Sequence, residues 1–143
     1  MQRILPTILV AGLSLAFIGC GERHGLIPVS ITITQKGNPL EGATVSAISS
    51  DGQGHSSSAT TNASGVAVMF TPAKGAGVLP GEYNVAVKKW ESYEVKSPSS
   101  DDPNGVTTEQ QNILPAKYGE HSSSGFKLTV GSKATEVSFD IGE

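Results

Sequence analysis

Apolar and polar residues alternate along several short segments of this chain, and such alternation is typical of a strand that buries one of its two faces. In the segment 29–34, Val-Ser-Ile-Thr-Ile-Thr, aliphatic and hydroxyl residues take turns. The same alternation, complete or shortened, recurs in residues 43–48, 58–61, 66–70, 82–88, 126–130 and 136–141. Strands with one apolar face are buried when two sheets stack. We therefore expect an all-β fold, a seven-stranded antiparallel β-sandwich.

The alternation also predicts which side chains point inward. They are Val29, Ile31 and Ile33; Ala43 and Ala47; Tyr83, Val85 and Val87; Phe126, Leu128 and Val130; and Val137, Phe139 and Ile141. Turn-forming residues separate the strands, because glycine and asparagine accept positive φ and proline fixes the exit of a turn. We expect turns at 36–39, 62–65 and 131–133, and loops at 49–58 and 74–81.

The segment 91–112 has no sustained periodicity and is rich in Ser, Pro, Asp and Asn. An unstructured span of this length in a compact domain is either functional or mobile. Trp90 and Tyr93 border it and could stack on a sugar or a peptide, as could Tyr118 beside Lys117. Aromatic residues at strand ends more often cover the end of a core. These three residues are the candidate ligand contacts.

The beginning of the chain follows another pattern. Arg3 supplies one positive charge, residues 4–18 are nearly all aliphatic, and Gly19-Cys20-Gly21 follows. About fifteen apolar residues are fewer than the roughly twenty that a transmembrane helix needs. Pro6 would also remove a helix hydrogen bond. This layout favours a signal peptide over residues 1–19, cleaved between Gly19 and Cys20.

The tetrapeptide Phe17-Ile18-Gly19-Cys20 resembles the lipobox of bacterial lipoproteins, although that family prefers leucine where Phe17 stands. The resemblance implies that Cys20 receives a diacylglyceryl group and becomes the acylated first residue, with residues 20–27 as a short tether. Two or more acyl chains hold a protein stably at a membrane. We expect an exported protein, lipid-anchored to a bacterial membrane at the outer membrane or the periplasmic face. An ordinary cleavage site beside a free thiol is the alternative.

Charge and cysteine content narrow the choice of partners. Removing the signal takes away Arg3 and no acid, so the net charge changes from −3 to −4. Lys88-Lys89 is the one basic pair, which argues against a nucleic-acid partner, because phosphate binding needs a basic face. Since Cys20 is the single cysteine, no internal disulfide can form and the domain relies on its core.

Several motifs, in order, resemble a carboxypeptidase regulatory-like domain. These are 28–30 with 36–45 (Lys-Gly-Asn-Pro-Leu-Glu-Gly-Ala-Thr-Val), a T-x-x-x-G turn at 61–65 and a P-G-x-Y-x-V strand entry at 80–85. Segments 114–118, 124–126 and 139–141 are similar to small bacterial lipoproteins built on this domain. The resemblance implies a transthyretin-like (prealbumin-like) sandwich over residues 28–143, usually non-catalytic. An immunoglobulin-like sandwich is the alternative.

Catalytic and metal-binding patterns are weak. His24, His55 and His121 lack the spacing of zinc ligands, and Asp101-Asp102 lacks the pattern of an EF-hand loop. No Gly-x-Ser-x-Gly elbow anchors a hydrolase triad. We therefore expect no metal, no cofactor and no enzymatic activity.

Three functions remain open at this point. The favoured one is a non-catalytic, lipid-anchored structural or interaction module of the cell envelope, with an unknown protein or glycan partner. The second is a carbohydrate- or peptide-binding module that uses residues 91–124. The third, a transthyretin-like hydrolase of a urate-derived ring, is disfavoured because that family needs channel histidines, an arginine and a different C-terminus.

Overall fold

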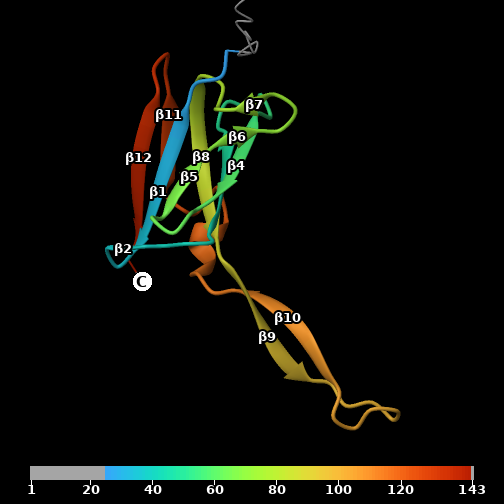
Figure 1. The fold of residues 1–143 in the computed structure, drawn as a ribbon. Helices are drawn as coiled ribbons and strands as arrows, with labels where there is room; N and C mark the ends of the chain where they lie inside the picture. The colour runs from blue at the N-terminus through green and yellow to red at the C-terminus, as the bar shows by residue number, and fades with distance from the viewer. Residues whose placement is uncertain (1–24, 143) are drawn as a thin grey trace, which may run out of the picture.

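The computed structural model describes residues 25–142, and the chain there is built almost entirely of strands (Figure 1). One 3₁₀ helix, η1 (Ala116–Gly119), interrupts them. The strands are β1 (Val29–Gln35), β2 (Asn38–Pro39), β3 (Thr44–Ser49), β4 (Ser56–Thr60), β5 (Val66–Val68), β6 (Phe70–Thr71), β7 (Gly75–Ala76), β8 (Gly81–Lys88), β9 (Trp90–Lys96), β10 (Val106–Asn112), β11 (Phe126–Val130) and β12 (Thr135–Ile141). The all-β prediction is confirmed.

These strands form three sheets. The first has the order β12-β1-β2, with β5 also paired to β1. The second has the order β11-β8-β3-β4-β6-β7. These two sheets share one hydrophobic core and form the body of the molecule, whereas the third sheet, β10-β9, projects from one end (Figure 1). The expectation of seven strands is wrong, because the third sheet and three two-residue strands have no clear signature in the sequence.

The pairing of β1 with β12 is parallel, so the expectation of purely antiparallel sheets is also wrong. Its register runs from Val29 opposite Thr135 to Gln35 opposite Ile141. The segment 131–134 does not join β11 and β12 as a hairpin, since these strands belong to different sheets. It carries the chain across the edge of the body. β12 then enters the first sheet at the same end as β1, where the Thr135 N–H donates to the Pro28 carbonyl at 2.9 Å.

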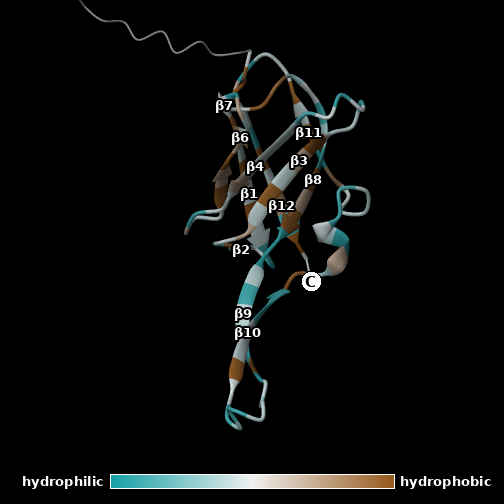
Figure 2. Ribbon diagram, turned by 90° about the vertical axis from the view of Figure 1, so that its right-hand side faces the viewer, coloured by the Kyte–Doolittle hydropathy of each residue, from teal (hydrophilic) through white to brown (hydrophobic). Residues whose placement is uncertain are grey.

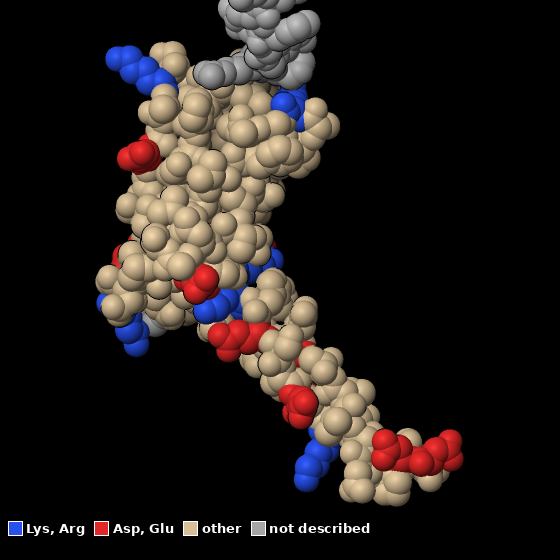
Figure 3. All heavy atoms as spheres, viewed as in Figure 1, with Lys and Arg blue, Asp and Glu red and all other residues tan. Residues whose placement is uncertain are grey.

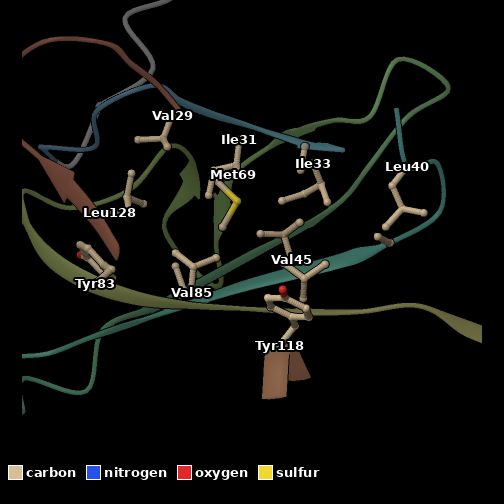
Figure 4. Packing of buried hydrophobic residues seen from close by; sticks show 14 of the residues in the cluster. Val29, Ile31, Ile33, Leu40, Val45, Met69, Tyr83, Val85, Tyr118 and Leu128 are labelled. Atoms are coloured by element: carbon tan, nitrogen blue, oxygen red, sulfur yellow. The ribbon is translucent and has the colours of Figure 1, made fainter. Parts of the chain in front are cut away.

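The core contains the side chains that the alternation predicted. Alternate residues are buried along most of β1, β3 and β8, while the residues between them are partly or wholly exposed, apart from the buried Ala86. Of the predicted inward residues of β12, Ile141 is fully buried, whereas Val137 and Phe139 are half-buried at the border of the core. Figure 4 shows Ile31 of β1, Val45 of β3 and Met69, which lies between β5 and β6, in the shared interior. Burying each such aliphatic side chain contributes about 1.5–3 kcal/mol.

The expected strand at 66–70 is in fact two strands in different sheets. β5 pairs with β1 of the first sheet, and β6 pairs with β4 of the second. Met69 lies between them, fully buried, with its N–H donating to the Val29 carbonyl and its own carbonyl accepting from the Gly77 N–H, both at 2.9 Å. The segment therefore connects the two sheets along one side of the core.

Two turns explain why the sequence needs glycine where it does. Lys36 and Gly37, with φ of 51° and 79°, form the two-residue turn between β1 and β2, so Lys36 takes the positive φ that we expected at Asn38. A Cβ atom at Gly65 would lie 2.5 Å from the Ile33 carbonyl oxygen, and its φ is 75°. Only glycine fits such a position.

The ordered domain begins before the expected boundary at residue 28. Leu26 is buried, and Ile27 forms a bridge with Val78 in which each N–H donates to the other residue's carbonyl at 2.8 Å. The last two residues assigned to the tether are therefore part of the body. The predicted signal peptide and Cys20 lie outside the described residues.

The expectation of an unstructured span at 91–112 is wrong. Its residues form β9 and β10, which pair along their whole length from Trp90 opposite Asn112 to Lys96 opposite Val106. Figure 2 shows that this ribbon is mostly hydrophilic. Both strands are exposed along nearly their whole length, and period-2 hydrophobicity is therefore absent. The residues 91–124 are thus a hairpin followed by η1, and not a loop.

Two buried hydroxyls give a matched test of the core. Thr61 Oγ1 accepts from the Ala43 N–H at 2.9 Å and donates to the Leu40 carbonyl at 2.6 Å, whereas Ser57 Oγ, in a residue only 2% exposed, has no partner among the described residues. Thr61→Val should lower the free energy of unfolding by about 1–3 kcal/mol. Ser57→Ala should leave it unchanged or raise it by up to about 1 kcal/mol.

Urea unfolding followed by circular dichroism measures both variants. A Thr61→Val variant as stable as the wild type would contradict the role of that hydroxyl.

Candidate functional site: the β9–β10 arm

The candidate site is the two-stranded arm, which we define as residues 90–112. It leaves the body at the end opposite Gly25, the first described residue (Figures 1 and 2). Each strand holds seven residues, which at roughly 3.4 Å per residue makes the paired part about 20 Å long. Among the described residues β9 and β10 pair only with each other, so each has one free edge.

The arm begins where β8 runs out of partners. The pairing of β8 with β3 ends at Lys88, opposite Thr44. Beyond Lys88 the chain pairs with its own return strand, and Asn112 closes the root. Asn112 Oδ1 accepts from the Lys89 N–H at 3.0 Å and from the Leu114 N–H at 3.3 Å, and the Ile113 N–H donates to the Lys89 carbonyl at 2.9 Å.

The tip of the arm, residues 97–105, is closed by its own hydrogen bonds. The Ser97 N–H donates to the Gly105 carbonyl at 2.8 Å, and the Ser99 N–H donates to the Asp102 carbonyl at 2.9 Å. Asp102 Oδ1 accepts from the Asn104 N–H at 3.1 Å. A Cβ atom at Gly105 would lie 2.7 Å from the Ser97 carbonyl oxygen. The tip is therefore a defined turn, in which the Asp102 carboxylate accepts a backbone hydrogen bond.

Trp90 and Tyr93 are both exposed, at 53% and 44%, but they lie on opposite faces of the arm. Side chains alternate between the faces of a strand, and residues opposite each other across the pair share a face. The tryptophan face carries Trp90, Ser92, Glu94, Lys96, Val106, Thr108, Gln110 and Asn112. The tyrosine face carries Glu91, Tyr93, Val95, Thr107, Glu109 and Gln111. The two aromatic rings therefore cannot both contact a ligand that binds on one face of the arm.

Tyr93 is held by a hydrogen bond across the arm. Its hydroxyl donates to Glu109 Oε2 at 3.0 Å. This bond and the negative charge of Glu109 raise the pKa of Tyr93 above its usual value. The tyrosine therefore stays neutral, with its ring fixed beside a carboxylate.

Tyr118 belongs to the body, away from the other two aromatic residues. It is 8% exposed, and its ring stacks on Phe126 at 5.2 Å between centroids, while Phe126 stacks on Phe139 at 4.6 Å. Figure 4 shows Tyr118 rising from η1 toward the core. Together with the buried Leu114, Tyr118 fixes to the body the chain that returns from β10. Tyr118 thus covers the end of the core, as aromatic residues at strand ends usually do.

The arm also carries the net negative charge of the described residues. Five acidic side chains stand on it against one basic side chain, and all five are exposed: Glu91, Glu94, Asp101, Asp102 and Glu109, with Lys96. In the rest of the described chain six acidic residues face seven basic ones. Figure 3 shows the acidic side chains spread along the arm and at its tip.

The histidines do not gather. His24 lies outside the described residues, and His55 lies in the loop before β4. His121 reaches β3, where its Nε2 lies 2.9 Å from Ser46 Oγ. Within residues 25–142, no three His, Cys, Asp or Glu side chains are grouped so that they could hold a metal ion.

The body also has a hollow on the outer face of the first sheet. Its volume is about 420 Å³, and it is lined by Ser30, Thr32, Val66, Glu136, Val137 and Ser138. Hydroxyls dominate it and no aromatic ring borders it. The sequence showed the alternating hydroxyls of β1, but not their register with β12, which creates this surface.

Comparisons with known proteins do not assign a family. No protein-family profile and no curated protein matches the chain. Among solved structures, the crystal structure of a 9R-lipoxygenase from Cyanothece is similar over 82% of this chain, with 12% identity and a TM-score of 0.32. The chain spans 16% of the length of that protein. A likeness this low supports no conclusion about function.

In the part of the chain that the structure describes, no helix has the length and hydrophobicity needed to span a membrane.

Asn112 gives a test of how the arm is held. Asn112→Ala removes an acceptor shared by two backbone N–H groups at the root, where each such hydrogen bond contributes about 0.5–1.5 kcal/mol. Amide hydrogen exchange within the arm should become about tenfold faster. Exchange in β3 and β8 should not change. Gln110→Ala, on the same strand, is the matched control, and equal effects of the two variants would refute this role of Asn112.

Proposed function

We propose that this chain is a non-catalytic, lipid-anchored protein of the bacterial cell envelope that uses its arm to contact a partner. The observation that carries the proposal is the position of the arm, which points away from the end at which the described chain begins (Figure 1). A protein held to a membrane by its N-terminal end would present this arm toward the opposite side.

The spacing between anchor and body supports this arrangement. Leu26 is already buried in the body, so six residue steps separate it from Cys20. At roughly 3.4 Å per step, the tether reaches about 20 Å at most. The body would therefore sit close to the lipid headgroups, and the arm would be the part that extends furthest from them.

The anchor is proposed on the sequence of residues 1–20. A short apolar segment, a small residue at Gly19 and the single cysteine at Cys20 are the features of a lipoprotein signal. A diacylglyceryl thioether together with an acyl chain on the new N-terminus supplies the two or more chains that stable anchoring needs. Outer membrane and periplasmic face remain the proposed destinations.

The body is proposed to be a carboxypeptidase regulatory-like domain of the transthyretin-like type. Supporting this, residues of its motifs have structural roles in this chain. Thr61 bonds the turn after Leu40, Gly65 permits close approach to Ile33, and Tyr83 of the P-G-x-Y-x-V motif donates to the Leu79 carbonyl at 2.9 Å. These roles concern folding, which agrees with the proposal that the body is a scaffold and the arm its contact element.

Metabolic labelling with radioactive palmitate tests the anchor. The wild-type chain expressed in a bacterium should take up the label and fractionate with membranes, whereas Cys20→Ala should do neither, because it lacks the thiol that is acylated. Ser122→Ala, at an exposed residue of the body, should behave as the wild type. An unlabelled wild-type protein with an unmodified full-length N-terminus in mass spectrometry would end this proposal.

A second candidate function is a carbohydrate- or peptide-binding module centred on Trp90. The observation that favours it is the exposed indole at the root of the arm, 53% exposed, with the exposed Ile113 following its partner residue Asn112. Indole rings are well suited to stacking on sugars and apolar side chains.

Glycan-array and peptide-array binding separate this candidate from the first. Trp90→Ala should abolish any signal at this site. Tyr93→Ala should preserve it, because Tyr93 lies on the opposite face of the arm. Arrays that stay blank at high protein concentration would reject the second candidate.

A further inference from the structure

The outer edge of β10 is an open hydrogen-bonding edge. β10 pairs with β9 on one side, and among residues 25–142 no strand covers its other side. Its sequence, Val-Thr-Thr-Glu-Gln-Gln-Asn, contains no Lys or Pro and one charged residue, Glu109. Natural proteins usually protect an edge strand with such residues or with a covering segment. An unprotected edge of seven residues is a template on which another extended chain can pair.

The charge of the arm restricts what can pair there. The arm carries five exposed carboxylates and a single ammonium group, and the rest of the described chain is close to neutral. Two copies of the arm brought edge to edge would bring like charges together, and each such contact is unfavourable. A basic segment would instead find complementary charge along the whole arm.

The tyrosine face supplies a specific contact one strand in from this edge, on β9, within reach of long basic side chains. The hydroxyl of Tyr93 is held by its hydrogen bond to Glu109, at 3.0 Å. Glu91 lies on the same face of β9, where its exposed carboxylate also pairs with Lys89 at 3.8 Å. An aromatic ring flanked by carboxylates suits a guanidinium or ammonium group, which can lie over the ring and pair with the acids. A strand added to β10 places its side chains about 5 Å from those of Thr107, Glu109 and Gln111.

From these features we propose that the arm binds a basic, extended polypeptide segment by strand addition to the free edge of β10. Every second side chain of that segment is basic and lies on the tyrosine face of the enlarged sheet. This inference rests on the proposed function, since it names the partner class that the arm contacts, but the two can fail separately. Backbone hydrogen bonds along β10 supply affinity, and the carboxylates select the charge of the partner.

The probe for the experiment is a fluorescein-labelled nine-residue peptide that alternates arginine and threonine. Its binding to the protein as it is expressed in a bacterium and purified in detergent micelles is followed by fluorescence anisotropy. We expect saturable binding that weakens as salt rises, because exposed charges are screened. A peptide with glutamate in place of arginine should not bind. A peptide N-methylated at alternate residues should bind at least tenfold more weakly, because it cannot complete the backbone ladder.

Two double variants with the same change of charge locate the site. Glu91→Gln with Glu109→Gln should weaken binding at least tenfold. Glu41→Gln with Glu82→Gln, at exposed residues of the body, should leave it unchanged. Tyr93→Ala should weaken binding as well, and a normal circular-dichroism spectrum of each variant shows that it has folded.

Several results would overturn the inference. One is that the N-methylated peptide binds as tightly as the unmodified basic peptide, and another is that the two double variants have equal effects. The others are that the basic peptide does not bind at millimolar concentration, or that the protein associates with itself through its arm and binds no peptide. Cys20→Ala separates the two proposals, because this variant should no longer fractionate with membranes but should still bind the peptide. If palmitate labelling fails but the peptide binds, only the anchor is refuted. If the peptide does not bind but the label is taken up, only this inference is refuted.

Discussion

The position of the arm depends on one constraint, namely that the chain continues as a strand beyond Lys88, where β8 and its pairing with β3 both end. Within the body β8 pairs with β3 and β11, and its inward side chains belong to the core. After Lys88 the neighbouring strands have ended, so the backbone donors and acceptors of the continuing chain must find partners elsewhere. They find them in β10, and the arm is the result. Asn112 at the root and Leu114 and Tyr118 in the core fix both of its strands to the body.

How far the sequence predicts this fold depends on burial. The strands of the body were visible because each buries one face, so hydrophobicity alternates along β1, β3 and β8. The arm escaped prediction for the same physical reason, since a ribbon exposed on both faces has no hydrophobic period. The parallel pairing of β12 and the change of sheet at Met69 are properties of topology, and local alternation does not encode them.

The candidate site was predictable only in its most visible residues. Trp90, Tyr93 and Tyr118 stood out as aromatics near a polar segment, but their relation depends on register and on burial. The register of the arm places Trp90 and Tyr93 on its opposite faces, and Tyr118 is buried in the core of the body. Glu109 and Asn112 have no distinguishing signal in the sequence, because their roles arise from partners 16 and 23 residues away. Cys20 is the reverse case, recognisable from sequence and outside the described residues.

The separation of charge between arm and body has a physical consequence for recognition. At physiological ionic strength the field of an exposed charge decays over about 8 Å, whereas the paired part of the arm is about 20 Å long. The tip carboxylates of Asp101 and Asp102 are therefore screened from the lysines of the body, and a partner approaching the arm meets the arm's own charge. Because the Tyr93 ring and the open β10 edge lie within that same field, charge attraction and backbone pairing would act on one segment of a basic partner. A scaffold that holds the paired arm by hydrogen bonds at its root would lower the entropy lost on such binding, relative to a free peptide of the same sequence.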